Sequence, residues 1–305
     1  MDEVTVHSPA TVSNVVCGFD CLGFALAEPF DLITVRRIEQ PTIRIINRDD
    51  YGLPTEPSKN VAGVALLAML QAMEASFGFE VEITKGIKPG SGIGSSSASS
   101  CGAVAAANHL LGNPFTKAEL VGFAMEGEKL ASGAKHADNV APCIFGGFTL
   151  VRSLDPLDIV SLTYPQLFAT VIHPQIEIKT SEARAILPTS VPLADAVRNW
   201  SNLGAFVAGL VNRDYELISK SMVDVIVEPA RSPLITNFDE VKAAGIGAGA
   251  LGGGISGSGP SIFMISSSLE TAQAVRRAMK EVYSSTGIEF NLYVSGIERE
   301  GVRIV

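Results

Sequence analysis

The sequence predicts an α+β fold made of two domains. The chain has 305 residues, more than the ~100–200 of a typical domain, and 47% of them are hydrophobic, enough for a substantial core. Short segments with the period of strands alternate with longer segments of helical period. Turn signals gather in the segment SLDPLDIVSLTYPQ near residue 155. We therefore predict an N-terminal domain over residues 1–155 and a C-terminal domain over residues 156–305.

The first half begins with strands and continues with helices. Four segments alternate apolar and polar residues, as half-buried strands do: 4–7, 32–36, 42–45 and 79–84. Apolar residues share one helical face over 58–73, where Ser58 is suited to cap the helix. A small-residue run over 95–111 predicts a helix that ends at Gly112. A capping box at Thr116 opens another helix, which we expect to end near residue 131.

The second half mixes both kinds of element, which is the pattern of an α+β domain. Three segments are expected to be strands: 168–172, 261–265 and 290–295. Four segments are expected to be helices: 193–210, 215–223, 238–244 and 269–282.

Charge and hydropathy exclude several classes of protein. The formal charge is -9 and the basic residues are scattered, which argues against a nucleic-acid partner. No stretch reaches the ~18 apolar residues of a membrane span, and the acidic start MDEVTVHSPA does not have the pattern of a signal peptide. We expect a soluble, cytoplasmic protein without a membrane partner. The four cysteines lack C-x-x-C spacing and are expected to be free thiols.

Two glycine-rich segments suggest an anion site. In PGSGIGSSSASS, which starts at Pro89, three glycines can bring bare backbone N–H groups against a phosphate at the start of a helix. The segment has no Walker A lysine and misses the Rossmann spacing, so a cradle of another type is predicted. The segment LGGGISGSGPS, from Leu251, has a similar density of glycine. Read alone, the first could be a turn into a tightly packed helix and the second a wide hairpin turn.

These segments resemble a known family. SPATVSNVVCGFDCLGFAL from Ser8, PGSGIGSSSAS from Pro89 and GGGISGSGPS from Gly252 resemble, in order and spacing, the three signature motifs of the GHMP kinases. Within that superfamily, N-x-x-x-G-F-D-x-L-G over 14–23 and GAKHADNVAP from Gly133 are similar to the homoserine kinase branch, as are KTSEAR from Lys179 and EPAR from Glu228.

The resemblance implies a fold and an activity. The fold would be an N-terminal domain like ribosomal protein S5 domain 2 and a C-terminal ferredoxin-like domain, with the active site between them. The activity would be ATP-dependent phosphorylation of the L-homoserine hydroxyl to O-phospho-L-homoserine, a step of threonine biosynthesis, with Mg²⁺. A homodimer, common in the family, is implied only by the resemblance.

The resemblance also implies nucleotide and metal residues. The adenine pocket would include Asn60. The phosphate site would comprise Pro89, Gly90, Ser91, Gly92, Ile93, Gly94, Ser95, Ser96, Ser97, Ala98, Ser99, Gly257, Ser258 and Gly259. Ser96 and Glu128 would hold Mg²⁺, which prefers a few hard oxygen ligands together with substrate phosphates. Glu126, in the same segment MEGEK, is the rival ligand.

A site for a zwitterion needs an acid for the ammonium and a cation for the carboxylate. Asp20 and Asp138 stand among apolar or small residues, where each carboxylate is expected to need a cationic partner. Arg184 and Arg231 carry guanidinium groups that match a carboxylate bidentately. The resemblance assigns the pocket to Asn14, Asp20, His136, Asp138, Arg184 and Arg231. Without it, the acids could cap helices, Arg184 could be a surface residue and His136 a structural histidine.

The residues expected nearest the reacting hydroxyl are Asn14, Asp138 and Asn139. Asp138 fits either a general base, as in several GHMP relatives, or substrate binding, as the homoserine kinases imply. Asn139 cannot accept a proton. Two other functions stay open: a GHMP kinase for mevalonate, shikimate or a cytidyl-erythritol, and a non-catalytic nucleotide-binding protein. Paired acids and arginines favour homoserine, because mevalonate and shikimate have no ammonium.

Overall fold

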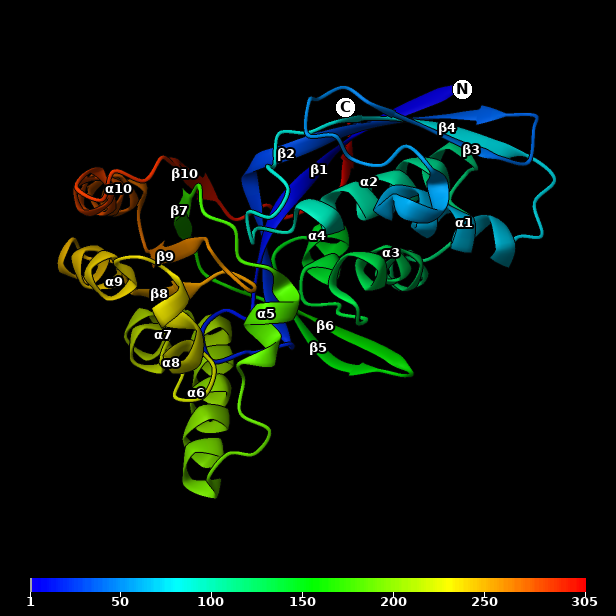
Figure 1. The fold of residues 1–305 in the computed structure, drawn as a ribbon. Coiled ribbons are helices and arrows are strands. Elements are labelled where there is room, and N and C mark those ends of the chain that lie inside the picture. Colours follow the sequence, from blue (N-terminus) through cyan, green and yellow to red (C-terminus); the bar gives the residue numbers. More distant parts are fainter. Residues whose placement is uncertain (1) are drawn as a thin grey trace.

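The computed structural model describes residues 2–305, which form two sheets with helices packed on them (Figure 1). The first sheet has seven strands, with the order β11-β1-β2-β4-β3 and a hairpin, β5–β6, attached to β2. Its strands are β1 (Glu3–Ser13), β2 (Leu22–Ile38), β3 (Ile43–Asn47), β4 (Gly78–Thr84), β5 (Phe148–Leu154), β6 (Leu157–Leu162) and β11 (Arg303–Ile304). All neighbours are antiparallel except β3 and β4, which are parallel.

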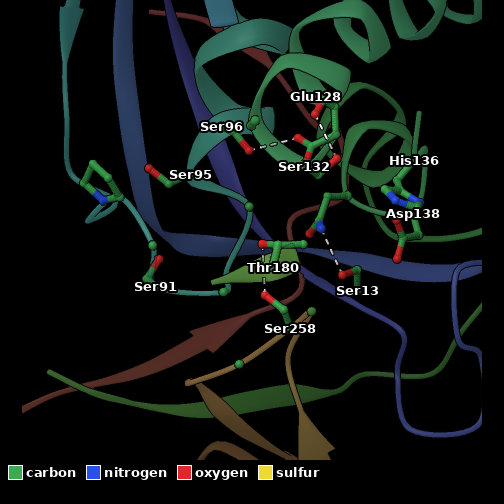
Figure 2. A pocket seen from close by; sticks show the side chains of 18 of the residues that line it. Ser13, Ser91, Ser95, Ser96, Glu128, Ser132, His136, Asp138, Thr180 and Ser258 are labelled. Atoms are coloured by element: carbon green, nitrogen blue, oxygen red, sulfur yellow. Dashed lines mark hydrogen bonds between the residues drawn. The ribbon is translucent and has the colours of Figure 1, made fainter. Parts of the chain in front are cut away.

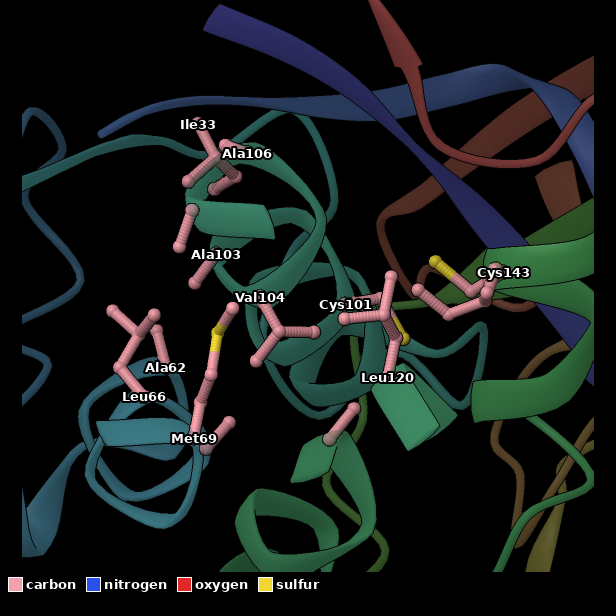
Figure 3. Close-up of a cluster of buried hydrophobic side chains, with 14 of the residues drawn as sticks. Ile33, Ala62, Leu66, Met69, Cys101, Ala103, Val104, Ala106, Leu120 and Cys143 are labelled. Atoms are coloured by element: carbon pink, nitrogen blue, oxygen red, sulfur yellow. The ribbon is translucent and has the colours of Figure 1, made fainter. Parts of the chain in front are cut away.

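Four helices cover one face of this sheet (Figure 1). They are α1 (Val61–Ala72), preceded by the 3-10 turn η1 (Pro57–Lys59), then α2 (Ser95–Leu110), α3 (Lys117–Ser132) and α4 (Val140–Phe145). The small residues of α2 let it lie close to the sheet: a Cβ at Gly102 would come 2.6 Å from Ile33. Figure 3 shows Met69 of α1, Val104 of α2 and Leu120 of α3 in the resulting core. This packing fixes the start of α2, where the glycine-rich segment ends.

The second sheet has four antiparallel strands in the order β10-β7-β9-β8. They are β7 (Phe168–Pro174), β8 (Gly252–Ile255), β9 (Ile262–Ser266) and β10 (Phe290–Gly296). The helices of this half are α5 (Thr180–Ala185), α6 (Leu193–Asn212), α7 (Tyr215–Ser221), α8 (Glu228–Arg231), α9 (Phe238–Gly247) and α10 (Leu269–Ser284), with the 3-10 turn η2 (Ser232–Leu234). None of the helices within residues 2–305 is long and apolar enough to cross a membrane.

One apolar cluster joins the two halves. Phe24 of β2 stacks on Phe148 of β5 with ring centroids 4.8 Å apart, and it meets Phe263 of β9 edge-on at 5.8 Å. Phe206 and Leu210 of α6 pack in the same cluster. Because these side chains are fully buried, the loops of the two sheets are held against each other, and the cavity described below lies between those loops.

The predicted α+β fold is confirmed, with corrections in detail. Helix α1 is capped by Asn60 and not by Ser58, because the Asn60 side chain accepts hydrogen bonds from the N–H groups of Ala62 and Gly63. Residues 252–255, expected as part of a loop, form β8. Residues 157–162, expected as a connection, form β6, so the predicted boundary at residue 155 falls in the turn of the β5–β6 hairpin. The division into two domains at that residue stays a prediction.

Candidate functional site

A cavity of about 340 Å³ lies between loops of the two halves. It is bounded by the turn after β1, the segment before α2, the end of α3, the start of α5 and the β8–β9 turn (Figure 2). Most predicted site residues line it: Asn14, Asp20, Pro89, Gly90, Ser91, Gly92, Gly94, Ser95, Ser96, Ser99, Glu128, His136, Asp138, Asn139, Arg184, Arg231, Gly257, Ser258 and Gly259. The fold thus brings segments more than 200 residues apart in sequence into one site.

The first glycine-rich segment forms a bare backbone loop. Gly90, Gly92 and Gly94 have positive φ angles of 74°, 78° and 71°, a conformation that L side chains rarely adopt. A Cβ at Gly94 would come 2.0 Å from Thr11 Oγ1. Gly94 is also the N-cap of α2 and offers no side chain to the N–H groups of the first helical turn. These groups therefore remain available to an anion, which the helix dipole also favours.

The second glycine-rich segment supports the first. Ser256 Oγ donates to Gly92 O at 2.7 Å, and Ser261 Oγ donates to Ser91 O at 2.6 Å. These bonds turn two carbonyl groups of the first loop toward the C-terminal half. A Cβ at Gly92 would come 2.5 Å from Gly259 O, so the loops touch backbone to backbone. The Ser91 hydroxyl lines the cavity, and within residues 2–305 it is buried without a hydrogen-bond partner.

Glu128, on α3, faces the start of α2. Its Oε2 accepts hydrogen bonds from Ser96 Oγ and Ser97 Oγ, both at 2.9 Å, and the residue is only 8% exposed (Figure 2). Glu126 instead pairs with Lys135 on the surface. Of the two acids, Glu128 is the one that lines the cavity. Ser96 and Glu128 offer hard oxygen atoms beside the anion loop, so they fit a Mg²⁺ ion whose other ligands are phosphate oxygens and water.

The turn between β1 and β2 links the two halves through Asn14. The side chain of Asn14 donates to Gly257 O at 2.7 Å and accepts from the backbone N–H of Asp20 at 3.0 Å. Asn14, Val15 and Val16 have positive φ angles of 69°, 41° and 61°. This backbone conformation is costly for β-branched residues such as the two valines. The hydrogen bonds of Asn14 help to hold this turn at the cavity wall.

Two arginines and one acid lie together near this turn. Arg184 Nη2 lies 2.9 Å from both carboxylate oxygens of Asp20, and His136 Nδ1 lies 3.7 Å from Asp20 Oδ1. Arg231 is only 3% exposed and donates to the carbonyl oxygens of Ala183 and Gly257, both at 3.0 Å. Burial lowers the pKa of Arg231, and the charge of Arg184 lowers it further.

The ring of Phe19 lies beside both guanidinium groups. Its centroid is 5.5 Å from Cζ of Arg184 and 5.2 Å from Cζ of Arg231, within the range of cation–π attraction. Phe19 also lines the cavity. The ring therefore offsets part of the repulsion between two like charges, and both charges remain next to the cavity.

Asp138 and Asn139 differ sharply in their surroundings. Asn139 accepts from Thr11 Oγ1 at 2.7 Å and donates to Ser13 Oγ at 2.9 Å, so its amide orientation is fixed. Asp138 is buried, with 4% of its surface exposed, and burial, followed by the charges of Asp20 and Glu128, raises its pKa to about 7. None of the ion pairs formed by residues 2–305 includes Asp138, so the cationic partner that we predicted for it is not a side chain of these residues and stays a prediction. The carboxyl group is instead largely neutral below pH 7.

Known proteins share the motifs that build this cavity. Residues 60–147 match the family model for the GHMP kinases N terminal domain, and residues 206–285 match the model for GHMP kinases C terminal. The homoserine kinases of Chloroherpeton thalassium and Chlorobium phaeovibrioides are each 47% identical to this chain, over 100% of both chains. The chain belongs to the GHMP kinase family. It is accordingly an ATP-dependent small-molecule kinase, as its motifs predicted.

Solved structures of GHMP kinases extend the likeness. A crystal structure of homoserine kinase from Cytophaga hutchinsonii has a TM-score of 0.96 and 49% identity, covering 100% of this chain and 98% of that one. L. major mevalonate kinase, in complex with R-mevalonate, has a TM-score of 0.72 and 14% identity over 95% of each chain, so it shares the fold. The predicted two-domain GHMP kinase fold is therefore confirmed.

Some predicted residues of this GHMP kinase lie outside the cavity lining. Asn60 uses its side chain to cap α1 and to donate to Pro54 O, while Ile93 and Ala98 are buried in the apolar cluster. Ser97 also lies outside the lining, but its hydroxyl donates a hydrogen bond to Glu128, which does line the cavity. Their predicted roles in nucleotide binding stay predictions.

Several lining residues were missed: Ser13, Phe19, Lys85 and Thr180. Three of them lie inside segments that carry the family resemblance, but no spacing rule singles them out. Lys85 had a weak signal, because it is a charge between an alternating strand and the glycine-rich loop.

Proposed function

We propose that this GHMP kinase phosphorylates the side-chain hydroxyl of L-homoserine with ATP. The observation that carries the proposal is a single cavity that joins a bare anion loop to a group of opposite charges. Gly90, Gly92 and Gly94 form the loop, and Asp138 and Arg231 stand on the wall beyond it. Such a cavity suits a phosphate donor and a zwitterionic acceptor.

The charges have separate tasks in this proposal. Asp20 is already paired with Arg184, so its carboxylate is matched before a substrate enters. Asp138 is buried and forms no ion pair with the described part of the chain, and a substrate ammonium would lower the cost of ionising it. Arg231 is buried, and among residues 2–305 its hydrogen bonds go to carbonyl oxygens, so it keeps its positive charge for the substrate carboxylate. Arg184 adds a second guanidinium on the same side.

The phosphates of ATP would lie on the glycine loop and the first turn of α2. Ser96 and Glu128 would hold Mg²⁺, which neutralises charge on the phosphates when it is bound. The neutral amide of Asn139, fixed by Thr11 and Ser13, would orient the acceptor hydroxyl. Phosphoryl transfer passes through a loose transition state, so we propose that positioning matters more here than a strong base.

A coupled ADP-release assay tests the acceptor. The purified protein with Mg²⁺ and ATP should turn over L-homoserine far better than mevalonate, shikimate or a cytidyl-erythritol. Equal turnover of a rival alcohol would make this a GHMP kinase with a different acceptor. ATP binding without ADP release on any alcohol would instead support the non-catalytic alternative.

We also propose that this kinase is a cytoplasmic homodimer whose partners are small molecules. The formal charge of -9 supports small molecules rather than nucleic acid as partners. A homodimer and a cytoplasmic location rest on the family resemblance and the sequence pattern. Sedimentation equilibrium of the purified chain would measure the first, and fractionation of cells the second.

A further inference from the structure

A buried ion pair lies beneath the glycine-rich loop. Asp31, in β2, contacts the ammonium group of Lys85, which follows the last residue of β4. The two side chains are 0% and 1% exposed. Such a pair does little for stability by itself, because removing both charges from water offsets their attraction. The other hydrogen bonds of both side chains go to the glycine-rich loop and to the first turn of α2.

The two members of the pair hold opposite ends of the loop. Asp31 Oδ1 accepts from the backbone N–H groups of Gly86 and Ile87, both at 3.0 Å, where the loop begins. Lys85 Nζ donates to Ser95 O at 2.8 Å and to Ser99 Oγ at 3.0 Å, where the loop runs into α2.

Two further contacts hold the two ends of the loop in place. Ser95 Oγ donates to Ile87 O at 2.9 Å and so ties the two ends of the loop directly. A Cβ at Gly86 would come 2.1 Å from Phe30 O, so the loop begins in direct contact with β2. The two ends of the loop are therefore tied together by buried and partly buried hydrogen bonds, while Gly90 and Gly92 line the cavity.

We propose that Asp31 and Lys85 are positioning residues that hold the glycine loop and the first turn of α2 in the geometry that binds phosphate. Lys85 lines the cavity, but Asp31 neutralises its charge, and its donors are directed at Asp31, Ser95 and Ser99. It therefore acts through the loop and not as a counter-charge to the nucleotide. The proposal rests on ATP use and not on homoserine as the acceptor, so it can fail or succeed independently of the substrate assay.

The test compares phosphate-dependent with phosphate-independent binding. The double variant Asp31→Asn/Lys85→Met removes both charges without leaving one buried alone. We expect its affinity for ADP, measured by titration calorimetry, to fall about ten-fold or more, because small displacements of a binding group are costly. Its affinity for adenosine should change by less than about two-fold, since adenosine does not use the loop. The matched control, Arg48→Met/Glu82→Gln, removes an ion pair between the exposed Arg48 and the half-buried Glu82 of β4, neither of which lines the cavity, and should change neither affinity.

Two results would overturn the proposal. One is a double variant that binds ADP as the wild type does, and the other is a parallel loss of adenosine and ADP affinity, which would indicate general disruption. Hydrogen exchange of the ligand-free wild type provides a second test of the proposal, one that does not depend on any variant. The amides of Gly86 and Ile87 should be protected and those of Gly90 and Gly92 should exchange freely, and rapid exchange at the first two would also refute the proposal.

Discussion

Replacing Asp138 by Asn should make this protein more stable at neutral pH and worse at binding its acceptor. Burial, with the nearby charges of Asp20 and Glu128, raises the pKa of Asp138 from 3.8 to about 7. A rise of that size corresponds to about 4 kcal/mol that disfavours the ionised form in the folded protein. The substitution removes the ionisable group and so removes this cost.

The sign of the pH dependence follows from linkage. The folded state holds the Asp138 proton more tightly than the unfolded state does. No cost is present below pH 3.8, the cost grows between pH 3.8 and about pH 7, and it is constant above that range. The stability of Asp138→Asn minus that of the wild type should therefore rise with pH by up to about 1.4 kcal/mol per pH unit and level off above pH 7.

Urea unfolding of the ligand-free proteins at several pH values between 5 and 8 measures this difference. The control is Asp50→Asn, which makes the same substitution at an exposed carboxylate instead of a buried one. A flat difference for Asp138→Asn would show that the ionised carboxylate carries no such cost, and the reasoning would be wrong.

Kinetics test the role of the same residue in the reaction. Wild-type kcat/KM for homoserine should rise with pH through about 7, because the ionised carboxylate binds the ammonium, while kcat shows no acidic limb. In Asp138→Asn the rise should disappear and the KM for homoserine should increase. A large loss of kcat at unchanged KM, together with loss of an acidic limb in kcat, would instead make Asp138 the general base.

Three further predictions concern Arg231, Glu128 and Asn60. Arg231→Leu should raise the KM for homoserine about ten-fold or more and leave that for ATP nearly unchanged, whereas the exposed Arg198→Leu should alter neither; an unchanged homoserine KM would remove Arg231 from the pocket. Glu128→Gln should lower turnover and raise the Mg²⁺ requirement while Glu126→Gln does little, and the reverse ranking would identify Glu126 as the ligand. Asn60→Ala should lower the free energy of unfolding by about 1 kcal/mol through loss of the α1 cap, and an unchanged denaturation midpoint would contradict the cap.

The fold could be predicted where elements are long and periodic. The predicted helices over 95–111 and 269–282 correspond to α2 and α10, and the capping box at Thr116 is present at the start of α3. The elements that were missed depend on partners elsewhere in the chain. Strand β6 is half exposed and exists through its pairing with β5. Strand β8 consists largely of glycines, which have little strand preference and are placed there by close contacts with β9, with Met222 and with Glu228 of α8.

The site could be predicted where it is made of backbone. Glycines close together in sequence on a strand-to-helix turn favour positive φ angles and leave the backbone bare, so the local pattern was sufficient to predict the loop at Gly90. Side-chain partners could not be found in this way. Asn14 bonds to Gly257, 243 residues away, and Asp20 to Arg184, 164 residues away. Nothing in either local segment encodes its partner, because the contact exists only after the two sheets have packed.

Asp20 and Asp138 show the consequence most clearly, because the sequence assigned both the same need for a cation. The structure meets that need for Asp20 with Arg184 and leaves Asp138 with a raised pKa. An ammonium that approaches the Asp20–Arg184 pair meets a nearly neutral group and must compete with a guanidinium. An ammonium that approaches Asp138 meets a carboxyl whose ionisation it favours, and the binding energy offsets the cost of removing the proton. Asp138, the acid with the raised pKa, is therefore the one expected to gain most from the substrate.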